Sequence, residues 1–132
     1  MRRRALLTLV ALAAAPGAAL AGEPDKKKKA GGASYLPIDT LTGATNKPGG
    51  RRGVLTVDCG LDIPDAGLRA RADALLPRLR AAFVQTVTIY AAGLPTGAPP
   101  NADFLAMALQ RETNQVLGRP GARLLLGAIL VN

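Results

Sequence analysis

The stretch Gly53-Val-Leu-Thr-Val-Asp-Cys-Gly-Leu-Asp-Ile63 decides the fold class of this chain. Apolar residues alternate along it with polar or small ones, which is the period of a β-strand with one buried face and one solvated face. A strand of this kind belongs to a sheet that is covered on one side only. Pro64 ends the pattern, and the side chain of Asp65 is suited to cap a helix that follows.

The segment before this strand predicts a hairpin. Tyr35–Leu41 has strand character, and Pro37 confines it to a sheet edge or to the start of a strand, because proline cannot donate a backbone hydrogen bond. Asn46–Gly53 is rich in Gly and Pro and predicts the turn that joins the two strands.

Two amphipathic helices are expected after Asp65. Apolar side chains recur at spacings of three and four residues as far as Tyr90, which predicts a helix with one stripe packed on the sheet. Pro77 lies in the middle of this pattern and should kink the helix or divide it in two; we expect a bend. Asn101 predicts the cap of a second helix, and Gly118 predicts its end.

The last element, Arg123–Val131, is apolar nearly throughout. This composition predicts a strand with both faces covered that lies centrally beneath the helices, and the short length together with Gly127 disfavours a buried helix. The order strand, strand, helix, helix, strand predicts an α+β domain whose antiparallel or mixed sheet has about three strands.

Residues 1–21 have the features of a secretory signal peptide. Arg2–Arg4 form a basic start, Ala5–Ala15 is an uncharged apolar run, and Ala19-Leu20-Ala21 is the small-x-small pattern of a cleavage site. We expect cleavage after Ala21 and a periplasmic protein. The alternative is an uncleaved N-terminus that anchors the chain in the inner membrane. The adjacent arginines also allow the twin-arginine export route, so the route stays open.

Residues 22–33 form a basic linker, and residues 34–132 are long enough for a single small domain. Because residues 1–21 hold three arginines and no acid, the remainder carries 14 basic and 9 acidic side chains. Lys26, Lys27, Lys28 and Lys29 stand in a segment with nothing to bury, which predicts a solvated linker; the alternative is peripheral contact with an anionic membrane surface. Export and the scarcity of aromatic residues argue against nucleic acid as a partner.

The residues that carry most acid–base and nucleophilic chemistry are missing. The sequence has no histidine, and its single cysteine, Cys59, falls on the apolar face of the predicted strand, where we expect a small buried hydrophobe. Asp58 and Asp62 share the opposite face and form the one conceivable acid/base pair, although polar alternation on a solvated sheet face explains them equally well. The sequence therefore predicts a protein that is not an enzyme, with no cofactor and no metal site.

Arg69, Arg71, Arg78 and Arg80, which we call the arginine ridge, recur on the polar side of the first predicted helix. A ridge of arginines is a candidate interaction surface for an acidic partner or ligand. The alternative is a solvated face whose long side-chain stems cover apolar surface.

Three stretches resemble the periplasmic domain of the flagellar basal-body-associated FliL family. They are the strand Gly53–Ile63, the segment Ala74–Phe83 with Leu76-Pro77-Arg78 inside it, and the pair Leu109–Leu117 and Leu124–Asn132. The resemblance spans Tyr35 to Asn132. It implies a small α+β fold like that of stomatin-type domains, a non-enzymatic role, and assembly beside the flagellar stator.

Two functional hypotheses follow. The first is an exported, non-enzymatic periplasmic protein that acts through contacts with itself or with an envelope assembly, and the resemblance implies the flagellar motor as that assembly. The second is a free periplasmic binding module that recognises an anionic ligand or the membrane surface through the arginine ridge and Lys26–Lys29.

Overall fold

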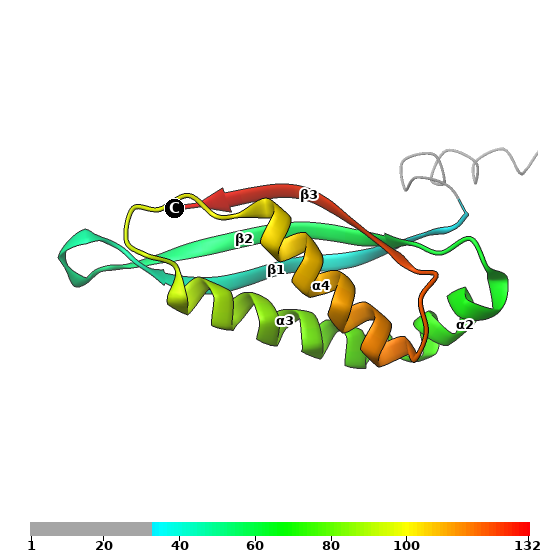
Figure 1. Ribbon diagram of the computed structural model, residues 1–132. Helices are drawn as coiled ribbons and strands as arrows, with labels where there is room; N and C mark the ends of the chain where they lie inside the picture. The colour runs from blue at the N-terminus through cyan, green and yellow to red at the C-terminus, as the bar shows by residue number, and fades with distance from the viewer. Residues whose placement is uncertain (1–32) are drawn as a thin grey trace, which may run out of the picture. The chain divides into compact units, whose positions relative to one another are not determined.

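Three antiparallel strands form one sheet in the computed structural model, which describes residues 33–132 (Figure 1). The strands are β1 (Tyr35–Asn46), β2 (Arg52–Asp62) and β3 (Arg123–Val131), in the order β1-β2-β3. A single 3-10 turn, η2 (Pro48–Gly50), lies in the β1–β2 connection. The predicted α+β class, hairpin and three-stranded sheet are confirmed. The predicted signal peptide at residues 1–21 and the tetralysine at Lys26–Lys29 lie outside the described residues.

The helices are α2 (Ala66–Ala74), α3 (Leu76–Gly93) and α4 (Ala102–Leu117), and they pack on one face of the sheet. Figure 1 shows α3 running along β1, with α4 crossing the sheet obliquely from the β3 side toward α3. Within residues 33–132, no helix has the length and apolar character needed to span a membrane.

Pro77 divides the first predicted helix in two instead of bending it. Leu75, between α2 and α3, has φ −99° and ψ 12°, outside helical geometry. Pro77 then stands in the first turn of α3, where its missing N–H leaves no intrahelical hydrogen bond unmade. The expected bend is therefore a break, which allows α2 to leave the axis of α3.

The predicted helix caps are confirmed. An Asp65 carboxylate oxygen accepts a hydrogen bond from the Leu68 N–H at 2.7 Å, and Asn101 Oδ1 accepts one from the Phe104 N–H at 3.0 Å. Gly118 ends α4 in the left-handed conformation, at φ 83°, a backbone shape that a residue with a Cβ adopts only at a cost.

The apolar face of β2 is the centre of the core. Leu55, Val57 and Leu61 are fully buried against the helices, whereas Val54 and Asp58 on the other face are exposed. Burying each of these leucine and valine side chains contributes roughly 1.5–3 kcal/mol. The half-buried strand predicted from the alternation is thus confirmed, and it is the middle strand of the sheet.

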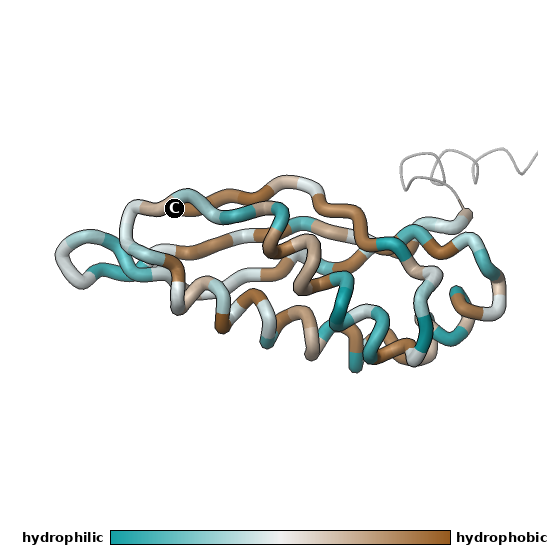
Figure 2. Tube along the Cα trace, in the orientation of Figure 1, coloured by the Kyte–Doolittle hydropathy of each residue, from teal (hydrophilic) through white to brown (hydrophobic). Residues whose placement is uncertain are grey.

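The predicted central position of Arg123–Val131 is wrong, because β3 is an edge strand. Its inner face is only partly covered, and on the outer face Leu125 and Leu130 are 36% and 60% exposed. Because β3 is the last strand, it has a neighbouring strand, β2, on one edge only. Among the described residues, no helix covers the face of β3 that points away from α3 and α4. Figure 2 shows this apolar run following β3 along the border of the sheet.

Both outer strands bulge around the same residue of β2. Asp39 and Thr40 of β1, and Gly127 and Ala128 of β3, stand opposite the single residue Asp58. Two bulges at one level strengthen the local twist of the sheet. Thr40 Oγ1 also donates to the Asp58 carboxylate at 2.8 Å, so the Asp58 side chain has a structural partner at the bulge.

The closest approach between a helix and the sheet is at Gly43 of β1. A Cβ added to Gly43 would lie 2.8 Å from the Ala91 Cβ and 2.9 Å from the Val87 carbonyl oxygen, both in α3. Only a glycine at this position lets the α3 backbone lie so near to β1. Gly43 therefore sets the separation between helix and sheet.

Gly43→Val should destabilise the domain by about 1–3 kcal/mol, because its side chain must push α3 away from β1. The matched control is Ala44→Val, on the exposed face of the same strand, which should be near neutral since β-branched residues suit strands. Thermal and urea unfolding followed by circular dichroism measure the difference. Equal stability of the two variants would contradict the close approach.

Candidate functional site

The arginine ridge makes contacts within the domain. Arg69 forms an ion pair with Asp73 at 3.4 Å and donates to the Tyr35 carbonyl oxygen at 3.1 Å. Arg80 pairs with Asp39 of β1 at 3.0 Å. The bonds to Tyr35 and Asp39 tie α2 and α3 to the first strand, whereas the pair with Asp73 lies within α2.

Arg71 Nε donates to the Leu117 carbonyl oxygen at 2.7 Å and so satisfies a backbone acceptor at the end of α4. Arg78 is exposed at the start of α3. Three of the four ridge arginines thus have intramolecular partners, which leaves fewer guanidinium donors for an external anion.

The two aspartates on the solvated face do not meet. Asp62 accepts a hydrogen bond from the Ser34 hydroxyl at 2.5 Å, and Asp58 accepts one from Thr40. Between them, the Tyr35 ring lies over Gly60, where any Cβ would collide with it. Within residues 33–132, no group of three or more His, Cys, Asp or Glu side chains is placed to hold a metal ion.

Cys59 is a buried free thiol, as the strand pattern predicted. Burial and, to a smaller extent, the nearby Asp58 carboxylate raise its pKa from 9.0 to about 11. Since the thiolate is the reactive form, this environment leaves the thiol unreactive at neutral pH.

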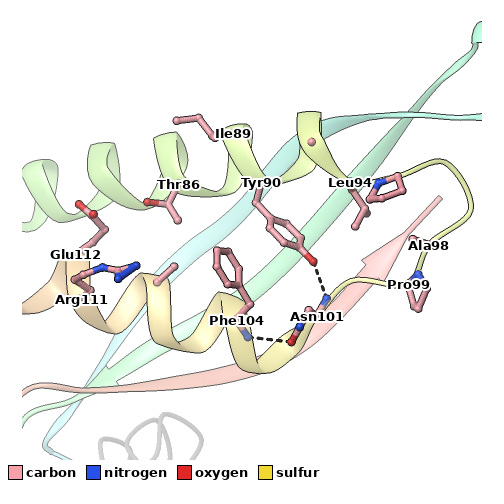
Figure 3. A pocket seen from close by; sticks show the side chains of 13 residues that line it. Thr86, Ile89, Tyr90, Leu94, Ala98, Pro99, Asn101, Phe104, Arg111 and Glu112 are labelled. Carbon is pink, nitrogen blue, oxygen red and sulfur yellow. Dashed lines mark hydrogen bonds between the residues drawn. The ribbon is translucent and has the colours of Figure 1, made fainter.

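A groove lies between α3 and α4. Its volume is about 630 Å³, and it runs from the loop of residues 94–101 along the facing sides of the two helices (Figure 3). We call it the α3–α4 groove. Its lining is mainly apolar and includes Ile89, Tyr90, Leu94, Pro99, Phe104 and Ala108.

An aromatic pair forms the middle of the groove. The rings of Tyr90 and Phe104 stack with centroids 5.5 Å apart and an interplanar angle of 24°. The Tyr90 hydroxyl accepts a hydrogen bond from the Asn101 N–H at 2.7 Å. Because Asn101 also caps α4 through the Phe104 N–H, one residue holds both the start of the helix and the Tyr90 hydroxyl (Figure 3).

The two ends of the groove differ in chemistry. Figure 3 shows Leu94 and Pro99 at the loop end, with Arg111 and Glu112 at the opposite end. Ile89 and Phe104 on its walls are 64% and 46% exposed, so the groove is open to solvent along its length. Its surface can therefore receive apolar side chains, with charged groups available at one end.

The sequence pattern did not reveal this groove. Tyr90 and Phe104 both fit the apolar stripes of their helices, yet Phe104 is half exposed and Tyr90 only partly buried. The feature of the sequence that could have indicated the groove is the position of these two aromatic residues. Two of the four aromatic residues of the chain stand on either side of one Pro/Gly-rich loop.

No protein-family model matches this chain, and no curated protein matches it.

The raised pKa of the Cys59 thiol predicts that the domain loses stability at alkaline pH. Because the pKa of the folded thiol, about 11, lies above its ordinary value of 9.0, this group stabilises the fold fully below pH 9. That contribution is lost as the pH rises from 9 toward 11, since the unfolded chain gains stability by ionising first.

Urea unfolding across this pH range should show the loss in the native protein, and Cys59→Ala should show a smaller slope. The same native protein should react slowly with a thiol reagent at neutral pH and rapidly in denaturant. Fast reaction of the folded protein would contradict the buried thiol.

Proposed function

We propose that this chain is an exported, non-enzymatic periplasmic protein that acts through protein–protein contacts in the cell envelope. The main support for this proposal is the α3–α4 groove, an open apolar surface that residues 33–132 leave uncovered. Exposed apolar surface of this kind is typical of contact sites between proteins.

The occupant that fits the groove is an apolar segment of a partner protein. Sites for small molecules normally enclose most of the ligand, whereas here Ile89 and Phe104 stand open on the walls. Aromatic anchors ringed by a few polar groups are the usual centre of a protein interface, and Tyr90 with Phe104 provides such a pair. Arg111 and Glu112 are placed to select charged residues that flank the apolar segment.

The flagellar version of this proposal is carried by the family resemblance alone. It adds that the partner belongs to the motor, beside the stator. Unchanged swimming of a deletion strain would remove that version and leave the groove proposal standing.

An anionic-ligand module is the weaker candidate. Its basis was the arginine ridge together with Lys26–Lys29, which lie outside the described residues. Within the ridge, Arg69, Arg71 and Arg80 are engaged with groups of the same domain. Intramolecular partners compete with any external anion for the same donors.

Photocrosslinking in living cells tests the groove. Benzoylphenylalanine in place of Ile89 should give a discrete adduct with one partner protein, and mass spectrometry should place the bond in an apolar peptide. Phe104→Ala should reduce that adduct roughly 10- to 30-fold, as expected when truncation of an aromatic anchor costs about 2 kcal/mol.

The control places the same photoprobe at Val84, an exposed apolar residue of α3 that does not line the groove. Five residues separate the two sites, which is about 140° around the helix. Equal adducts from both sites, a bond to lipid, or a bond to another copy of this chain would each contradict the proposed occupant.

Export is tested by the N-terminus of the protein recovered from cells. Mass analysis should find Gly22 as the first residue, in a fraction released with the periplasm. A chain that keeps Met1 or Arg2 and sediments with membranes would favour the anchored alternative.

A further inference from the structure

Residues 47–52 form the turn from β1 into β2, and we call this segment the basic tip. It contains Lys47, Arg51 and Arg52 and no Asp or Glu. Arg51 and Arg52 are exposed, and Lys47 is partly buried. The tip projects beyond the ends of α3 and β3 (Figure 1), and Figure 2 shows it as a hydrophilic end of the sheet. Its positive charge is therefore presented at one end of the domain.

No group of the domain competes with an external anion for these cations. Among the described residues, no ion pair or side-chain hydrogen bond engages Lys47, Arg51 or Arg52. Along the two strands, the nearest acids are Asp58 and Asp39, which lie about 20 Å or more from the tip at the usual rise per strand residue. The arginine ridge is the opposite case, because three of its four guanidinium groups have partners in the domain.

The backbone of the turn holds the two sides of the tip together. The Lys47 N–H donates to the Arg51 carbonyl oxygen at 2.7 Å, and the Gly50 N–H donates to the Lys47 carbonyl oxygen at 3.2 Å. Gly49 and Gly50 have φ values of 83° and 79°, which residues with a Cβ adopt only at a cost. Because the turn is already closed, a ligand of the cations does not have to order the backbone of the tip.

We propose that the basic tip binds the phosphate headgroups of an anionic phospholipid surface. The composition of the tip favours this partner over a protein or a nucleic acid. Pro48 is its one apolar side chain and it has no aromatic ring, so it lacks both the large anchor of a protein interface and a platform on which a base stacks.

Charge is the means of binding that this composition leaves. A layer of anionic headgroups offers many negative groups to a projecting point and requires no matching pocket. Each Lys or Arg near such a surface raises the affinity about five-fold.

The proposal goes beyond the protein–protein contact assigned to the α3–α4 groove. Lys47, Arg51 and Arg52 do not line that groove, so either proposal can fail without the other. It also places the membrane contact on other residues than Lys26–Lys29, which lie outside the described part of the chain.

Co-sedimentation of the full chain, processed by the cell, with lipid vesicles tests the tip. The native protein should bind vesicles of phosphatidylglycerol and phosphatidylethanolamine, dissociate from them at high salt, and not bind vesicles of phosphatidylcholine. Arg51→Gln combined with Arg52→Gln should lower the partition coefficient roughly 30-fold, because two cations are lost from the contact. A native protein that does not bind the anionic vesicles, or that binds both kinds equally, overturns the proposal.

The matched control is Arg78→Gln combined with Arg123→Gln. It removes the same charge from exposed arginines at the starts of α3 and β3, and the start of β3 pairs with the end of β2 that lies away from the tip. Its partition coefficient should stay within about two-fold of the native value, since the surface potential falls off within a Debye length. Both variants keep Lys26–Lys29, so any contribution of those lysines is the same in both.

Circular dichroism should show that both variants are folded, because all four substituted side chains are exposed. Equal binding of the tip variant and the control overturns the assignment to the tip. A protein that does not bind the vesicles but binds an oligonucleotide through Arg51 and Arg52 would identify nucleic acid as the partner and overturn the proposal as well.

Discussion

The close approach of α3 to β1 over Gly43 is the constraint on which the remaining architecture depends. With the Ala91 Cβ and the Val87 carbonyl oxygen where a side chain of residue 43 would stand, the helix lies directly on the strand. A helix packed this near to β1 buries Leu79, Phe83 and Val87 completely against the sheet. Since α3 runs along β1, the β3 half of the same face must be covered by α4, which crosses the sheet obliquely.

Two surfaces remain open beside these helices: the later part of β3 and the α3–α4 groove. The side-chain hydrogen bonds from α4 to this strand lie near its start, where Gln110 bonds to both Ala122 and Leu124, and Leu130 and Val131 in the later part of β3 are exposed. The same obliquity separates α4 from α3 near the loop of residues 94–101 and opens the groove.

Local sequence rules predicted the features that depend on neighbours along the chain. The alternation of Gly53–Ile63, the caps at Asp65 and Asn101, and the stop at Gly118 each follow from residues within one turn or one strand. The position of Arg123–Val131 in the sheet is set by strand order, which its apolar composition does not encode, so the expected central strand is an edge. Likewise, a helical period identifies Tyr90 and Phe104 as apolar-stripe residues but not whether another element covers them.

Charge shows the same division between local and tertiary information. The arginine ridge is visible in the sequence as a recurring pattern, yet its partners Asp39, Tyr35 and Leu117 lie far away in the chain. Each of those bonds joins a helix to another element, so the ridge links elements of the domain, whereas the sequence pattern indicated either a solvated face or a surface for an acidic partner. In the proposed interface the surface left for a partner is apolar, with the stacked Tyr90 and Phe104 as its anchor and with Arg111 and Glu112 at its charged end. An interface of this composition gains its affinity from desolvated apolar area and depends little on ionic strength, which separates it physically from binding to an anionic ligand.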